Sequence, residues 1–162
     1  MSTATSFGSD AARPDGRGLR FGVVVARFNS DITERLLNGA LRGFAACGVG
    51  AADVLVVRVP GAVELPLAAQ RLLRAPHFVA GVVALGCVIR GETTHYDYVC
   101  RAAVDGVLRV MLDEGKPVAF GVLTCETSAQ ALQRAGDGDD NKGFEAALTA
   151  VETARLRAEP TR

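Results

Sequence analysis

Apolar residues occur along the chain in two alternating patterns, short continuous runs and longer stretches with helical spacing. The first run, residues 19–26, is rich in valine and nearly continuous, which is typical of a parallel strand covered on both faces. The next stretch begins with capping oxygens at Asn29, Ser30 and Asp31 and ends at Gly48. Because its apolar residues recur at helical spacing, it is predicted to be an amphipathic helix.

The same alternation of strand and helix continues to near the end of the chain. Strands that alternate with helices of this length are joined by right-handed crossovers, so their sheet is parallel and lies between helical layers. We therefore expect an α/β fold, a flavodoxin-like three-layer α/β/α sandwich with a four-stranded parallel sheet. The further strands are expected at residues 53–59, 78–85 and 117–123, and the further helices at 64–74, 96–113, 128–135 and 141–158.

The helix expected at residues 96–113 has an apolar surface wider than one sheet would cover. Val104, Leu108 and Leu112 extend an already apolar face around the helix. Because a chain of this length has little material left to cover the excess, we expect a homo-oligomer. The first face consists of Tyr98, Val99, Ala102, Ala103, Val107, Val110 and Met111.

Length and sequence composition predict a single domain. The 162 residues suit one compact unit at 19–158, preceded by a flexible arm at 1–18 and followed by a short tail at 159–162. The arm lacks the apolar core of a secretory signal. The longest apolar run, residues 78–89, is well short of the roughly 20 residues that cross a bilayer, so no membrane span is expected.

Charge and cysteine content narrow the classes of partner and site. Eighteen basic and eighteen acidic side chains give a formal net charge of zero, which argues against a general attraction to nucleic acid or anionic membranes. A small molecule or another copy of the chain is the expected partner. The four cysteines form no CxxC pair, so neither a zinc site nor a disulfide framework is expected, and we interpret them as reduced thiols of a cytoplasmic protein.

Reactive groups are concentrated where the expected strands end. The richest segment, residues 85–99, passes from a buried strand through Arg90 and Gly91 into a helix, and includes two threonines and a histidine. A helix amino terminus at the carboxyl end of a strand favours anions, so a phosphate-bearing substrate is predicted. Because the carboxyl ends of parallel strands share one edge, we expect this segment to share a pocket with residues 26–29, 60–66 and 120–124.

Five side chains are candidates for binding or chemistry, and each has a plain structural alternative. Phe28 can stack on a planar heterocycle or simply cover the next helix. Glu64 can accept hydrogen bonds from a polyol or complement a helix dipole. His95 can take and give protons near neutral pH or cap its helix. Arg134 and Lys142 can hold a phosphate or complement helix ends.

Together these segments resemble the lumazine synthase family, which makes 6,7-dimethyl-8-ribityllumazine in the penultimate step of riboflavin biosynthesis. The likeness extends from about Leu19 to Glu152, and its motifs occur in the family's order with compatible spacing. The motifs are ARFN (26–29), VPGAVELP (59–66), ALGCVIRGETTHYDYV (84–99), FGVLT (120–124), RAG (134–136) and NKG (141–143).

The resemblance implies that 5-amino-6-(D-ribitylamino)uracil condenses with 3,4-dihydroxy-2-butanone 4-phosphate, releasing phosphate and water without a redox cofactor or metal. His95 would move protons and Arg134 would hold the phosphate. In the family the site lies between subunits of pentamers, which form decamers or hollow sixty-subunit icosahedral shells in some members. The implied binding residues are Phe28, Ala62, Glu64, Cys87, Val88, Ile89, Glu92 and Thr93 of one subunit, with Phe120, Arg134 and Lys142 of its neighbour.

Three other functions remain open on the sequence. An archaeal-type riboflavin synthase shares the fold but joins two lumazine molecules, and the unbroken match around His95 argues against it. A non-catalytic flavin-binding module would use the same scaffold and retain a yellow ligand. A Schiff-base aldolase would use the amine of Lys142.

Overall fold

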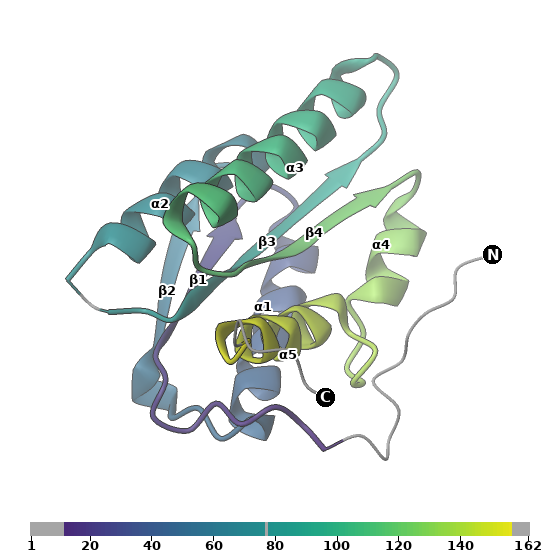
Figure 1. Cartoon of the computed structure of the whole chain (residues 1–162). Helices are drawn as coiled ribbons and strands as arrows, with labels where there is room; N and C mark the ends of the chain where they lie inside the picture. Colours follow the sequence, from purple (N-terminus) through teal and green to yellow (C-terminus); the bar gives the residue numbers. More distant parts are fainter. Residues whose placement is uncertain (1–11, 77, 157–162) are drawn as a thin grey trace, which may run out of the picture.

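The computed structural model describes residues 12–76 and 78–156 as a four-stranded sheet between two layers of helices (Figure 1). All strand pairs are parallel, and the strand order is β2-β1-β3-β4. The predicted three-layer α/β/α sandwich is therefore confirmed. The strands are β1 (Phe21–Ala26), β2 (Val54–Val59), β3 (Gly81–Ile89) and β4 (Val118–Cys125).

Helices cover both faces of the sheet, and each face has its own buried core. Helices α1, α4 and α5 contribute to the core on one face, while α2 and α3 cover the other face (Figure 1). Strand β1 is buried at every position, as its continuous valine pattern requires. The helices are α1 (Ser30–Ala46), α2 (Leu65–Arg74), α3 (His95–Glu114), α4 (Ser128–Arg134) and α5 (Lys142–Ala154), with 3-10 turns η1 (Ala51–Asp53) and η2 (Ala62–Glu64).

The third strand differs most from its prediction. It begins at Gly81 instead of residue 78 and continues to Ile89 instead of residue 85. Phe78 is 85% exposed and has a positive φ of 54°, a conformation that a strand does not contain. At the other end, β4 pairs with β3 as far as Ile89 opposite Cys125, which extends both strands beyond the predicted limits.

The two ends of the described chain differ from their predictions in different ways. Helix α5 ends at Ala154, earlier than the predicted residue 158, and residues 157–162 lie outside the described part. Residues 1–11 of the expected arm also lie outside it. Residues 12–18 contact the body of the domain: the Gly16 amide donates to Cys47 O at 2.7 Å, and Arg155 donates to the Asp15 and Arg17 carbonyls at 2.9 Å.

Helix α3 leaves an apolar strip uncovered in the single chain. Val104, Leu108 and Leu112 are exposed, as expected from the width of the apolar pattern. Tyr98, which the pattern placed on the sheet-facing side, is 69% exposed as well. Only Ala103, Val107 and Val110 of this helix are buried. In the described residues, no helix combines the length and the apolarity needed to traverse a bilayer.

Candidate active site

The first candidate site, called here the first hollow, lies at the carboxyl ends of β1 and β3 beside the start of α3. It has a volume of about 490 Å³ and brings together three of the sequence segments that were expected to meet. Glu92, which lies between the lining residues Gly91 and Thr93, is exposed and does not itself line the hollow. The expected residues that line it are Phe28, Ala62, Glu64, Cys87, Val88, Ile89, Thr93 and His95.

Backbone pairing beyond the end of β1 positions Phe28. The amides of Arg27 and Phe28 donate to the carbonyls of Val59 and Pro60, at 2.8 and 3.0 Å, so the backbone is fixed up to this residue. The Phe28 side chain is nevertheless 72% exposed. An aromatic ring on a fixed backbone with an open face is suited to stacking on a planar ligand.

Asn29 has a different role from the predicted helix cap. It adopts the left-handed conformation, with φ 57° and ψ 47°, and its side chain makes no capping hydrogen bond to α1. Instead, its Nδ2 donates to Cys87 O at 2.9 Å. This bond connects the turn after β1 to β3 and so fixes Phe28 relative to the other wall of the hollow.

Glu64 closes the turn that follows β2. Its Oε2 accepts a hydrogen bond from the Gly61 amide at 2.9 Å, while its own amide donates to Gly61 O at 3.3 Å. A carboxylate carries a second oxygen that can accept hydrogen bonds from hydroxyl groups. Both the capping alternative and the polyol-binding interpretation are therefore compatible with this geometry.

The start of α3 lines one side of the first hollow. Thr94 is the N-cap residue but its side chain makes no capping bond, and the His95 amide donates to Thr93 Oγ1 at 3.3 Å. Residues 90–95 are all exposed. Exposed amides at the amino terminus of a long helix favour a bound anion through hydrogen bonds and the helix dipole.

Arg90 is a residue whose contacts the sequence did not reveal. Its Nε donates to Glu126 Oε2 at 2.8 Å, its Nη2 lies 3.4 Å from Asp97 Oδ1, and its guanidinium is 4.3 Å from the centre of the Tyr96 ring. Burial raises the pKa of the Tyr96 phenol, which keeps it neutral. Arg90 thus connects the end of β3 to the first turn of α3 and to the segment after β4.

Cys87 lines the hollow but is unsuited to act as a nucleophile. Its side chain is 3% exposed and belongs to the core beneath α1 and α5. Burial, with smaller contributions from Cys125 and Asp31, raises the pKa of the Cys87 thiol to about 12. Because the thiolate is the reactive form, the neutral thiol at ordinary pH is inert.

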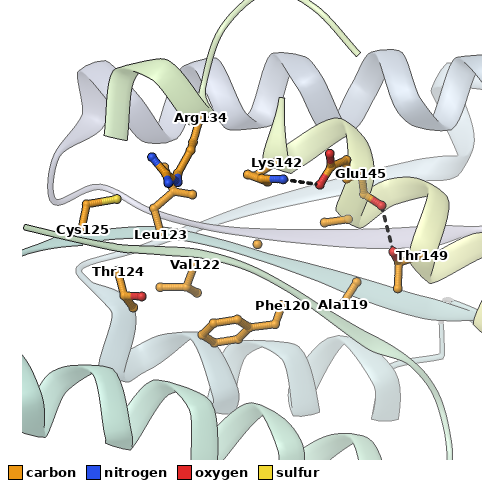
Figure 2. Close-up of a pocket in the computed structure, with 12 residues that line it drawn as sticks. Ala119, Phe120, Val122, Leu123, Thr124, Cys125, Arg134, Lys142, Glu145 and Thr149 are labelled. Atoms are coloured by element: carbon orange, nitrogen blue, oxygen red, sulfur yellow. Dashed lines mark hydrogen bonds and ion pairs between the residues drawn. The ribbon is translucent and has the colours of Figure 1, made fainter. Parts of the chain in front are cut away.

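The remaining candidates form a separate second hollow of about 310 Å³ between β4, α4 and α5. Phe120 lies on the strand side, across from Arg134 and Lys142 on the helices (Figure 2). Arg134 Nη1 donates to Gln130 O at 3.1 Å, and Lys142 Nζ contacts Glu145 Oε2 at 2.7 Å. The second hollow therefore has an aromatic ring and two cations, which suits a phosphorylated ligand.

The expectation that residues 120–124 share a pocket with residues 26–29, 60–66 and 85–99 does not hold within one chain, because residues 120–124 line the second hollow. Strand β4 lies at the edge of the sheet, so Phe120 lines the β4–α4–α5 side, while the first hollow is built on the ends of β1 and β3. The sequence pattern could place residues at strand ends, but it contained no signal for which side of the edge strand each would line.

The described part of the chain shows no cluster of metal-ligating side chains at either hollow. Among residues 12–76 and 78–156, no group of three or more histidine, cysteine or acidic side chains is arranged to hold an ion. The four cysteines are free thiols, and Cys47, Cys87 and Cys125 are buried. In a comparison with protein-family models, residues 18–158 of the 162 in the chain match 6,7-dimethyl-8-ribityllumazine synthase.

Proposed function

Because the chain belongs to the 6,7-dimethyl-8-ribityllumazine synthase family, a family of transferases in riboflavin biosynthesis, we propose that it catalyses that family's condensation. The substrates are 5-amino-6-(D-ribitylamino)uracil and 3,4-dihydroxy-2-butanone 4-phosphate, and phosphate and water are released. The observation that carries the proposal is the pair of hollows, one with an aromatic ring, a carboxylate and an imidazole, the other with an aromatic ring and two cations.

The first hollow is proposed to bind the uracil substrate. Phe28 stacks on the pyrimidine, and Glu64 beside Ala62 accepts hydrogen bonds from the ribityl hydroxyls. The ring edge pairs with the backbone at Cys87, Val88 and Ile89. This assignment is supported by the exposed ring of Phe28 and by Cys87, which lines the hollow while its side chain packs in the core beneath α1 and α5.

The start of α3 is proposed to hold the phosphorylated substrate beside the uracil. The amides near Glu92 and Thr93 and the Thr93 hydroxyl bind phosphate, and Arg134 supplies the balancing cation. His95 accepts and returns protons while the 5-amino group forms an imine with the ketone, water leaves, and phosphate is eliminated. The enol left by phosphate elimination becomes a ketone, the ribitylamino nitrogen attacks this carbonyl, and loss of a second water closes the second ring.

We propose that each complete site combines the first hollow of one subunit with the second hollow of its neighbour. Two findings support this arrangement: Arg134 and Lys142 do not line the first hollow within one chain, and Leu108 and Leu112 leave α3 with an apolar strip. Exposed apolar surface of this kind is typical of subunit contacts. The pentamer is the minimal assembly proposed, and the cytoplasm is the proposed location.

Catalysis is expected to depend mainly on holding both reactive substrates in the right orientation. Juxtaposition of two reactants converts a bimolecular step into an effectively unimolecular one and can supply a large share of the rate enhancement. Proton transfer by His95 adds a smaller contribution. The site therefore needs no residue that forms a covalent bond with substrate.

The direct test feeds both substrates to the purified protein and follows lumazine absorbance together with phosphate release. The proposal expects both signals only when both substrates are present. Product formed from lumazine alone identifies a riboflavin synthase instead, and a retained yellow ligand without phosphate release identifies a flavin-binding module. A stable adduct after borohydride treatment with the butanone phosphate identifies a Schiff-base aldolase.

Complementation tests whether the site is shared. Subunits carrying Phe28→Ala with His95→Ala are unfolded and refolded together with Arg134→Ala subunits, and each is also refolded alone. For equal random mixing, about a quarter of the shared sites regain both intact hollows, because half of the chains supply each one. Activity no greater than the mean of the two separate preparations contradicts a shared site.

A further inference from the structure

We infer that Asn141 is a positioning residue that sets the spacing between Arg134 and Lys142 in the second hollow. The inference rests on the proposed function, because it concerns how those two cations are presented to a phosphorylated substrate. Asn141 directly precedes Lys142 and is 1% exposed, which makes it, with Thr33, one of two buried polar side chains in the described chain.

The amide of Asn141 connects the end of α4, the start of α5 and the middle of α1. Its Nδ2 donates to Gly136 O at 2.8 Å and to Arg35 O at 3.2 Å. Its Oδ1 accepts from the amides of Gly143 and Phe144 at 2.8 and 3.2 Å, which caps α5. Since Gly136 lies two residues after Arg134, one side chain holds both cation-bearing helix ends.

Two glycines leave the space that the Asn141 side chain occupies between α1 and α5. A β-carbon on Gly39 of α1 would overlap the Asn141 amide, and a β-carbon on Gly143 would overlap Leu36 O. The two helices therefore approach closely around the amide. A buried polar group is stabilising only when its hydrogen bonds are satisfied, and both ends of this amide have partners.

The cations themselves have little other support. Arg134 is exposed and bonds only the carbonyl of Gln130 within its own helix among the interactions described, and Lys142 pairs with Glu145 one turn along α5. The connecting residues 137–140 are all exposed, and their contacts are at the surface, where Arg42 donates to Gly138 O at 3.1 Å and both Arg13 and Arg42 pair with Asp139. Because displacement of a binding group by about 1 Å can greatly weaken catalysis, the backbone tie at Asn141 governs how well the pair acts together.

The test is Asn141→Asp, which keeps the oxygen that caps α5 but replaces the Nδ2 donor with a second oxygen facing two carbonyls. We expect the KM for the butanone phosphate to rise about tenfold and the KM for the uracil substrate to change less than about twofold. Lowering the pH protonates the buried carboxyl, which can then donate to Gly136 O. The KM ratio of variant to wild type at the same pH should therefore fall toward one.

Val151→Ala is the matched control, because Val151 is fully buried on the same helix but lies near the opposite end. It should lower the midpoint of thermal unfolding, while the KM for the butanone phosphate and the KM for the uracil substrate change by the same factor. Equal KM changes for both substrates in Asn141→Asp, or a ratio that does not depend on pH, overturn the inference. If the aspartate variant does not fold, Asn141→Ser, which retains a capping oxygen but loses the amide donors, is measured in the same way.

Failure of the proposed function is recognised separately, because the wild-type protein then makes no lumazine from both substrates. In that case calorimetric binding of inorganic phosphate replaces turnover. Weaker phosphate binding by Asn141→Asp than by Val151→Ala supports the positioning role. Equal binding by the two variants overturns it.

Discussion

Among changes in the second hollow, Arg134→Ala should most clearly lower activity while leaving stability unchanged. The side chain is exposed, and its Nη1 donates a hydrogen bond to Gln130 O in the same helix. Surface substitutions of this kind change the free energy of unfolding by no more than about 0.5 kcal/mol. The urea midpoint of Arg134→Ala should therefore match that of the wild type.

The effect on activity should be much larger. A hydrogen bond to a charged group contributes about 1.5 to 3 kcal/mol, and loss of the phosphate contact should lower kcat/KM by a factor of roughly 10 to 150. His95→Ala should slow turnover without abolishing it and should be less damaging, since the substrates remain held together. Arg71→Ala, in the last turn of α2, is the matched arginine control and should retain full activity.

Steady-state rates with each substrate varied in turn, measured beside urea unfolding curves, provide the assay. Near-normal kcat/KM in Arg134→Ala together with complete inactivity in His95→Ala would refute the reasoning. A large fall in the urea midpoint of Arg134→Ala would also contradict it, because the lost activity could then follow from unfolding.

Three further predictions concern stability and assembly. Gly43→Ala places a β-carbon 2.8 Å from Phe144 O where α1 meets α5, so it should lower the free energy of unfolding by about 1 to 3 kcal/mol. Gly91→Ala is the control, because its β-carbon would have no neighbour within 4 Å, and its urea midpoint should equal that of the wild type. Burial raises the pKa of Cys87 from 9.0 to about 12, so above pH 9 the folded state keeps a proton that the unfolded state releases. The free energy of unfolding should therefore fall between pH 8 and pH 10. Urea unfolding curves at the two pH values should show a smaller fall for Cys87→Ala than for the wild type. Leu108→Glu puts a charge on the exposed apolar strip of α3 and should lower the sedimentation coefficient; an unchanged value would exclude this strip from the subunit contact.

The order of strands and helices was readable from the sequence because the sheet is buried on both faces. The valine-rich run in β1 has no solvent-exposed position, so its pattern needed no tertiary information. The boundaries of β3 were not readable in this way. The apolar character of Phe78 resembles that of the strand residues, and only its exposed position and positive φ exclude it.

The pattern of strand ends predicted the site segment by segment, while its division into two groups of residues was implied only by the family resemblance. Asn141 illustrates the difficulty, since a polar residue before a helix predicts a cap, which it is, but its bond to Arg35 O joins residues 106 positions apart. Nothing near either residue in the sequence indicates that contact. The same holds for Asn29, which appeared to cap α1 but bonds to β3.

Arg155 connects the two ends of the described chain, because its guanidinium donates to the carbonyls of Asp15 and Arg17. The first and last parts of the described chain are thus in contact, and little entropy would be lost in joining them through a short linker. New ends could then be opened in an exposed turn far from both hollows, which makes this fold a suitable scaffold for circular permutation.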